Sequence, residues 1–227
     1  MLRKTLLTIA VGVAALAFGA SSSKAVEIDF GALALPGGCN ATSDAQAGHV
    51  CGNTVTYTGT PAGTLTGQSF NGAPTGIPAG NVTVRLLTDV GGALNESGLG
   101  QTPNATCLAD CEINGTASVA ITSSVALGLA DVLVGSAQAG EQFSVWTLVG
   151  GVLQDTFPNF VPNATNCPNS ICTFNFAGTT EVAVQNTGTG NVLLTSVSTP
   201  AAAPEPASLA VLGAALVGFG MMRRRRR

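Results

Sequence analysis

The stretch QFSVWTLVGGVLQDT, residues 142–156, contains two β-rich runs joined by a pair of glycines. Its first run alternates in a way that puts successive side chains on opposite faces of a strand. Gly150 and Gly151 supply the positive φ that a tight hairpin turn requires. The stretch therefore predicts a β-hairpin.

Further alternating, β-branched runs occupy residues 53–58, 81–87, 117–125 and 180–185, with Gly, Pro and Asn between them. Residues 127–134 fit either a strand or a short helix, and no long stretch shows a convincing 3.6-residue apolar period. Short strands of this kind predict an all-β fold, an antiparallel β-sandwich of jelly-roll or Ig-like type.

The glycine hairpin recurs in the chain. An offset of 59 residues aligns VGGALNES (90–97) with VGGVLQDT (149–156), and PNAT (103–106) with PNAT (162–165). We interpret this as an internal repeat of about 59 residues, with copies at about 82–121 and 141–184. One copy alone leaves an apolar strand face uncovered, so the copies should pack face to face. They form either one sandwich or two small Ig-like sandwiches, and we favour one because no clear linker separates the copies.

Charge is sparse and segregated. Charged residues make up 9% of the 227 residues, against roughly 25% in an ordinary soluble domain. Between Val26 and Ala203 the only base is Arg85, set against eleven acids, which gives this segment a formal charge of −10. A body with no lysine and no basic patch cannot neutralise phosphates, which argues against nucleic-acid binding.

The N-terminal residues 1–25 have the pattern of a signal peptide: a basic start, an apolar run at 6–20 and small side chains before the expected cut. Signal peptidase is expected to cleave between Ala25 and Val26. The alternative is a retained anchor, but the apolar run is short for a span of about 20 residues.

The C-terminal end, residues 204–227, has three parts in order. It opens with Pro204, Glu205 and Pro206, and an apolar segment at 207–222 follows, which we expect to be a short transmembrane helix. The chain closes with a basic stop that the positive-inside rule places in the cytoplasm, which leaves the body outside. This stop consists of Arg223, Arg224, Arg225, Arg226 and Arg227.

These three parts together resemble the PEP-CTERM sorting signal of exported proteins from exopolysaccharide-producing Gram-negative bacteria. The resemblance covers about residues 204–227 and implies nothing about the body. It implies anchoring in the inner membrane, recognition by the transpeptidase exosortase, cleavage near the motif and transfer of the body to the cell surface or extracellular matrix. The alternative is an ordinary single-span anchor with a chance Pro-Glu-Pro.

The expected organisation has four segments. The signal peptide covers 1–25, the β-sandwich body 26–195, a flexible stalk 196–203 and the sorting signal 204–227.

Six cysteines fall in three local pairs, and the last two pairs recur in the repeat. An exported chain meets an oxidising compartment, so local disulfides are expected. Zinc is the alternative, but the last two pairs have x₃ and x₄ spacings instead of the usual Cys-x₂-Cys, and no histidine lies near either of them. No metal or cofactor is predicted. The expected pairs are Cys39 with Cys51, Cys107 with Cys111, and Cys167 with Cys172.

Few side chains suggest catalysis. His49 is the sole histidine and no Gly-x-Ser-x-Gly elbow accompanies it, so a structural role is favoured. Glu96 and Asp155 occupy equivalent repeat positions and offer a paired-carboxylate glycosidase site, although solvated hairpin ends are the favoured interpretation. We therefore predict no catalytic residue.

Two further features suggest binding. Trp146 points away from Val145 on its strand, where an exposed ring can stack on a sugar; packing under a loop is the favoured interpretation. Alternating threonines resemble the Thr-x-Thr arrays of ice-binding proteins, but one strand does not make a flat array. These threonines are Thr54, Thr56, Thr58 and Thr60.

The sequence thus predicts an exported, non-catalytic surface or matrix protein, associated with polysaccharide. Signal peptidase, exosortase and exopolysaccharide are its expected partners. The alternatives are a secreted glycan-active hydrolase using Glu96 and Asp155, and an ice- or glycan-binding module.

Overall fold

The computed structural model describes residues 25–41, 48–76, 80–85, 97–102, 112–126 and 128–200. Several predictions fall outside the described residues: those on the signal peptide up to Lys24, on Glu96, on Cys107 and Cys111, and on the sorting signal. Within the described residues, no helix combines the length and the apolar character needed to span a membrane.

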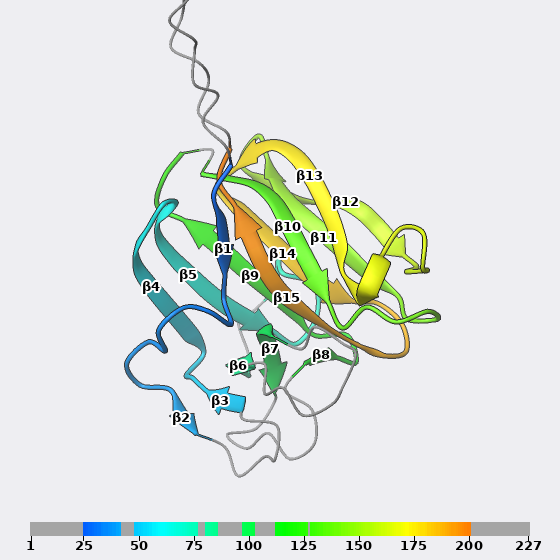
Figure 1. Cartoon of the computed structure of the whole chain (residues 1–227), viewed down its shortest axis with the longest axis horizontal. Helices are drawn as coiled ribbons and strands as arrows, with labels where there is room; N and C mark the ends of the chain where they lie inside the picture. The colour runs from blue at the N-terminus through cyan, green and yellow to red at the C-terminus, as the bar shows by residue number, and fades with distance from the viewer. Residues whose placement is uncertain are drawn as a thin grey trace, which may run out of the picture. The chain divides into compact units, whose positions relative to one another are not determined.

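Residues 26–200 form one compact unit of two antiparallel sheets, which Figure 1 shows one behind the other. The fold is an all-β sandwich, as the sequence predicts. The only helical turn among the described residues is the short 3-10 turn η2 (Pro168–Ser170).

The six-stranded sheet contains the hairpin predicted for residues 142–156. Gly150 and Gly151 adopt φ of 60° and 84°, as the tight turn requires. The strands, in spatial order, are β12 (Val152–Phe160), β11 (Phe143–Val149), β14 (Glu181–Asn186), β9 (Ser118–Ser123), β5 (Gly63–Phe70) and β4 (Thr54–Thr60).

The nine-stranded sheet faces it. Its main path is β13 (Cys172–Thr179), β10 (Leu129–Gly135), β15 (Asn191–Ser198), β7 (Gly98–Thr102), β6 (Asn81–Arg85), β3 (Gly48–Val50) and β2 (Asn40–Ala41). Two short strands, β1 (Glu27–Asp29) and β8 (Ile113–Asn114), also pair with β15. Of the segment 127–134, which fits strand or helix in the sequence, the residues from Leu129 onward form strand β10.

The core lies between the sheets and is anchored by aromatic rings. Phe174 of β13 meets three phenylalanines of the β11–β12 hairpin, with ring centroids 5.8 Å from Phe143, 5.0 Å from Phe157 and 4.9 Å from Phe160. Contacts of this kind stabilise a core beyond the area they bury. Phe174 therefore ties the hairpin to the opposite sheet.

The strands that the repeat aligns lie side by side. β9 and β14 pair antiparallel, with Ala120 directly opposite Ala183. These two alanines are also equivalent in the repeat, so a local pseudo-twofold axis passes between them. The rest of the copies differ, because β6 and β7 lie in the nine-stranded sheet whereas β11 and β12 lie in the six-stranded sheet.

The predicted boundary between body and stalk is wrong. The stalk was expected to begin at residue 196, but β15 continues to Ser198. Val197 is fully buried, and Ser196 and Ser198 pair with β1 on one side and β10 on the other. Small polar residues that suggest a linker are here held by sheet pairing on both edges.

Candidate functional site

The outer face of the six-stranded sheet carries rows of side chains that strand pairing aligns. We call this surface the tryptophan face. It is opposite the core, because the alternate residues Val145, Val182 and Leu65 of the same strands are fully buried between the sheets. Its central row, from β4 to β12, consists of Thr54, Gln68, Ala120, Ala183, Trp146 and Asp155.

Two parallel rows flank the central one. Threonines and a carboxylate form the first row: Thr56, Thr66, Thr122 and Glu181. An aromatic ring, hydroxyls and an amide form the second row: Phe70, Ser118, Gln185 and Ser144.

Trp146 lies at one end of an apolar strip on this face. It packs with Phe70, Ala120 and Ala183. The two alanines are only 2% and 0% exposed although they point away from the core, because the aromatic side chains cover them. Trp146 itself stays partly exposed. The structure therefore combines both interpretations of this tryptophan, as it packs on the sheet and also reaches solvent.

Two buried polar atoms on this face have no hydrogen-bond partner. They are Nε1 of Trp146 and Oδ1 of Asp155, which belong to directly opposite residues. Burial raises the pKa of the Asp155 carboxyl, and a hydrogen bond from Ser144 opposes that rise. Burial also raises the pKa of Glu181. Asp155 is thus a half-buried residue within β12, which corrects its interpretation as a solvated hairpin end.

A groove of about 300 Å³ adjoins the β4 edge of the tryptophan face. The disulfide between Cys39 and Cys51 forms part of its wall. Thr54 and Thr56 line the groove and also belong to the rows described above. The tryptophan face therefore continues into a concave, mostly polar edge.

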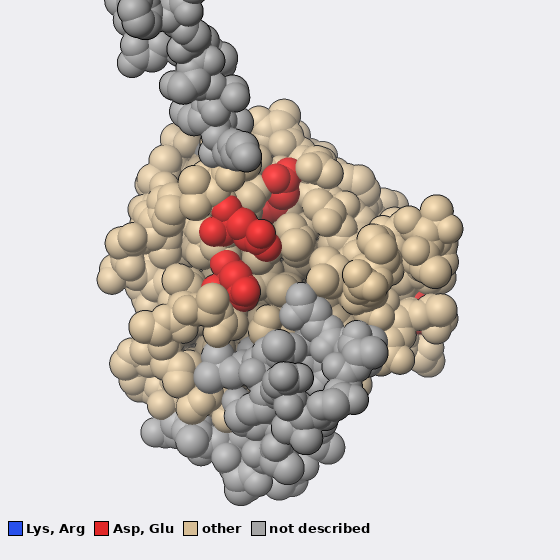
Figure 2. Space-filling model, in the orientation of Figure 1, with Lys and Arg blue, Asp and Glu red and all other residues tan. Residues whose placement is uncertain are grey.

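The outer face of the nine-stranded sheet has a different character. We call it the acidic face, after Glu27, Asp29 and Asp131. Glu27 and Asp131 flank Ser198 from the two neighbouring strands. Figure 2 shows acidic residues gathered on this side and no lysine or arginine among the described residues in view. Within the described residues, no group of three or more His, Cys, Asp or Glu is arranged to hold a metal ion.

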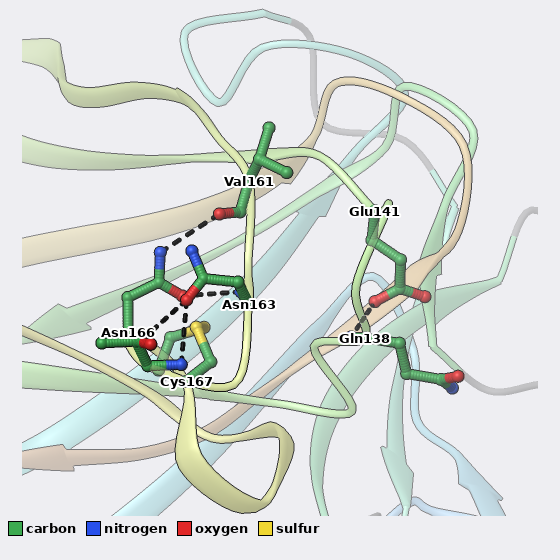
Figure 3. The surroundings of a disulfide bond; sticks show 8 residues. Gln138, Glu141, Val161, Asn163, Asn166 and Cys167 are labelled. Atoms are coloured by element: carbon green, nitrogen blue, oxygen red, sulfur yellow. Dashed lines mark hydrogen bonds between the residues drawn. A yellow bond between two sulfur atoms is a disulfide. The ribbon is translucent and has the colours of Figure 1, made fainter.

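The second described disulfide, between Cys167 and Cys172, closes the loop that the repeat motif begins. Oδ1 of Asn163 accepts hydrogen bonds from the backbone N–H groups of Thr165 (2.9 Å) and Asn166 (3.1 Å). Oδ1 of Asn166 in turn accepts a hydrogen bond of 2.7 Å from the backbone N–H of Asn163 (Figure 3). The Pro-Asn-Ala-Thr block is therefore a local turn motif.

The three predicted disulfides have different outcomes. The structure forms two of them, Cys39–Cys51 and Cys167–Cys172. The third predicted pair, Cys107 and Cys111, lies in the segment 103–111, outside the described residues, so the structure does not test it. A disulfide between Cys107 and Cys111 therefore stays a prediction, which depends on their alignment with the second pair in the repeat.

The lone histidine does not join the carboxylate. His49 lies on β3, paired with Ala41 and Val84 in the nine-stranded sheet, and its buried Nδ1 has no hydrogen-bond partner. Asp155 belongs to the other sheet. Its proposed carboxylate partner Glu96 lies outside the described residues, so no carboxylate pair is defined.

Several residues of the tryptophan face have no strong signal in the sequence. Gln68 and Phe70 come from β5 and Gln185 from β14, and only the pairing register brings them onto the same face as Trp146. The repeat offered one clue, because it aligns Ala120 with Ala183.

Comparisons with known proteins give little further information. No protein-family model matches the chain, and no curated protein matches it either. Among solved structures it is similar to the family 32 carbohydrate-binding module from C. perfringens NanJ in complex with galactose. That match has 12% identity and a TM-score of 0.33, and it covers 60% of this chain and 92% of the module. A TM-score this low carries no argument about function.

Proposed function

We propose that this protein is an exported, non-catalytic cell-surface or extracellular-matrix protein that associates with polysaccharide. The observation that carries the proposal is the tryptophan face. There a partly exposed indole has hydroxyl, amide and carboxyl groups around it on a disulfide-bonded sandwich. Aromatic surfaces with a few placed polar groups are typical of small-molecule and glycan recognition.

Export is supported by the ends of the sequence and by the cysteines. Disulfides persist in oxidising compartments outside the cytoplasm, and the described chain forms two, Cys39–Cys51 and Cys167–Cys172. Signal peptidase would remove residues 1–25. The segment 207–222 would hold the body at the inner membrane until exosortase cleaves near Pro204–Pro206.

The sorting step has a direct test. Replacing Pro204, Glu205 and Pro206 by alanine should leave the tail uncleaved, so an immunoblot should find a longer protein in the inner-membrane fraction. Pro200→Ala, just before the motif, is the matched control and should be processed normally. Unchanged processing of the triple variant would refute the sorting claim.

Polysaccharide association is tested by electrophoresis of the exported protein in native gels that contain a polysaccharide. The acidic body should repel acidic polymers, so gels with dextran or galactomannan should retard it while gels with alginate should not. Migration unaffected by every polymer would contradict the proposed function.

Ice binding is a second candidate, favoured by one specific observation. Thr56, Thr66 and Thr122 align across three neighbouring strands, which extends the threonine pattern beyond the single strand seen in the sequence. An assay of ice recrystallisation tests this candidate. If the wild type inhibits recrystallisation and Thr66→Tyr does not, ice binding is supported. If the wild type does not inhibit it, ice binding is excluded.

A further inference from the structure

We propose that the tryptophan face is the polysaccharide-binding site and that its ligand is a neutral polymer. In this arrangement sugar rings stack on Trp146, and their hydroxyls bond to Gln185 and to the exposed parts of Asp155. The proposal rests on the proposed polysaccharide association and adds to it a location and a ligand class.

The position of Trp146 is the first argument. Phenylalanine would make similar apolar contacts with Phe70, Ala120 and Ala183, and it would not bury an unpaired N–H donor. Leaving a buried donor unsatisfied is unfavourable for folding. Stability alone therefore does not explain a tryptophan here, whereas a wide ring that stays partly exposed suits stacking.

The residues around the ring provide the second argument. Gln185 pairs with Ser144 one row away from Trp146, and Glu181 lies one row away on the other side. Residues on neighbouring strands are about 4.8 Å apart, and successive residues on one face of a strand about 7 Å apart. Amides both donate and accept while carboxylates accept, so together they can satisfy the hydroxyls of a sugar.

Charge decides between neutral and anionic polymers. The charged residues in the rows of the tryptophan face are both acids, Asp155 and Glu181. The sole base of the body is Arg85, and it belongs to β6 of the other sheet. An anionic polymer would meet like charge with no cation to offset it. A neutral polysaccharide avoids this repulsion.

The extent of the face decides between a polymer and a single sugar. Six strands at about 4.8 Å spacing make a surface about 24 Å across. The central row runs over all six, from Asp155 to Thr54, and then meets the groove beside Cys39–Cys51. One partly exposed indole is too little apolar surface for the centre of a protein interface, which usually clusters several buried aromatic anchors.

Fluorescence provides the test, because Trp146 is the only tryptophan in the chain. Titrating the exported protein with dextran and with galactomannan should shift or quench its emission saturably with at least one of them, and alginate should leave it unchanged. In native gels, Trp146→Ala should weaken retardation by the bound neutral polymer roughly tenfold, the scale of losing one stacking contact. Leu133→Ala, which removes a half-buried apolar side chain from the acidic face, is the matched control and should bind like the wild type.

The outcomes separate the two proposals. One outcome would overturn this site while the proposed function stands. In it, neutral polymers retard the protein, the emission of Trp146 does not change, and Trp146→Ala binds as well as the wild type. Failure to bind any polymer would overturn both. If circular dichroism shows that Trp146→Ala is misfolded, Gln185→Ala takes its place: its half-exposed side chain makes one long contact of 3.4 Å to the Thr116 carbonyl. Wild-type binding by a folded Gln185→Ala, together with unmoved emission, would overturn the site.

Discussion

The two outer faces of the sandwich treat their polar groups in opposite ways. On the acidic face Glu27 accepts from Ser196, Asp131 from Ser198 and Asp29 from the Gly31 N–H, and none of their oxygens is buried without a partner. On the tryptophan face Nε1 of Trp146 and Oδ1 of Asp155 are buried without partners. Buried polar groups in folded proteins are nearly always paired, so each exception calls for an explanation, and a ligand is one such explanation. The acidic face contributes negative charge, and the tryptophan face is the face that we propose binds the ligand.

The largest expected effect comes from weakening the contact between the two sheets that carry these faces. Phe174→Ala removes the ring that ties the β11–β12 hairpin to the nine-stranded sheet. We expect it to lower the free energy of unfolding by about 3–5 kcal/mol, the usual loss for a buried phenylalanine. Denaturant unfolding measures it. Exposed Thr173→Ala on the same strand is the control, and an equal loss in both variants would contradict this role.

A smaller change disturbs only the tryptophan face. Ala183→Leu adds bulk beneath Trp146 on a fully buried site and should lower stability by about 1–3 kcal/mol through overpacking. It should also change the emission of Trp146, because the ring must move. A variant with wild-type emission and stability would show that Trp146 does not lie over this alanine.

The smallest expected effects compare one carboxylate from each face. Asp131→Asn weakens the hydrogen bond with Ser198 and should lower stability by about 1 kcal/mol. Asp155→Asn should raise stability at pH 7, because burial raises the pKa of this carboxyl and so penalises its charged form.

The sign of the pH dependence follows from the same shift. A carboxyl whose pKa is higher in the folded state stabilises the fold below its ordinary pKa of about 3.9, and this contribution is lost as pH rises through the folded value. Unfolding measured from pH 3 to pH 7 should therefore show a smaller loss with rising pH in Asp155→Asn than in the wild type. Parallel curves would contradict the raised pKa.

The sequence predicted what depends on local pattern. Alternation and Gly150-Gly151 predicted the β11–β12 hairpin, and close spacing predicted the disulfides of Cys39 and Cys167. β15 was missed as an element because its residues do not alternate: all but the first are buried, since the strand pairs with neighbours on both edges.

The composition of the tryptophan face could not be predicted for a related reason. Trp146 was singled out, but which residues surround it depends on register between strands that are distant in sequence. Gln68 reaches the central row only because β5 pairs with β9, and β9 in turn with β14. No local pattern encodes that order.

The most direct measurement uses the single indole N–H resonance that Trp146 gives in a ¹⁵N-correlated NMR spectrum. Our account predicts that dextran or galactomannan shifts this resonance progressively to saturation, in parallel with retardation in the gel, and that alginate leaves it in place. A resonance that stays unmoved while the protein binds a neutral polysaccharide would contradict the tryptophan face as the binding site.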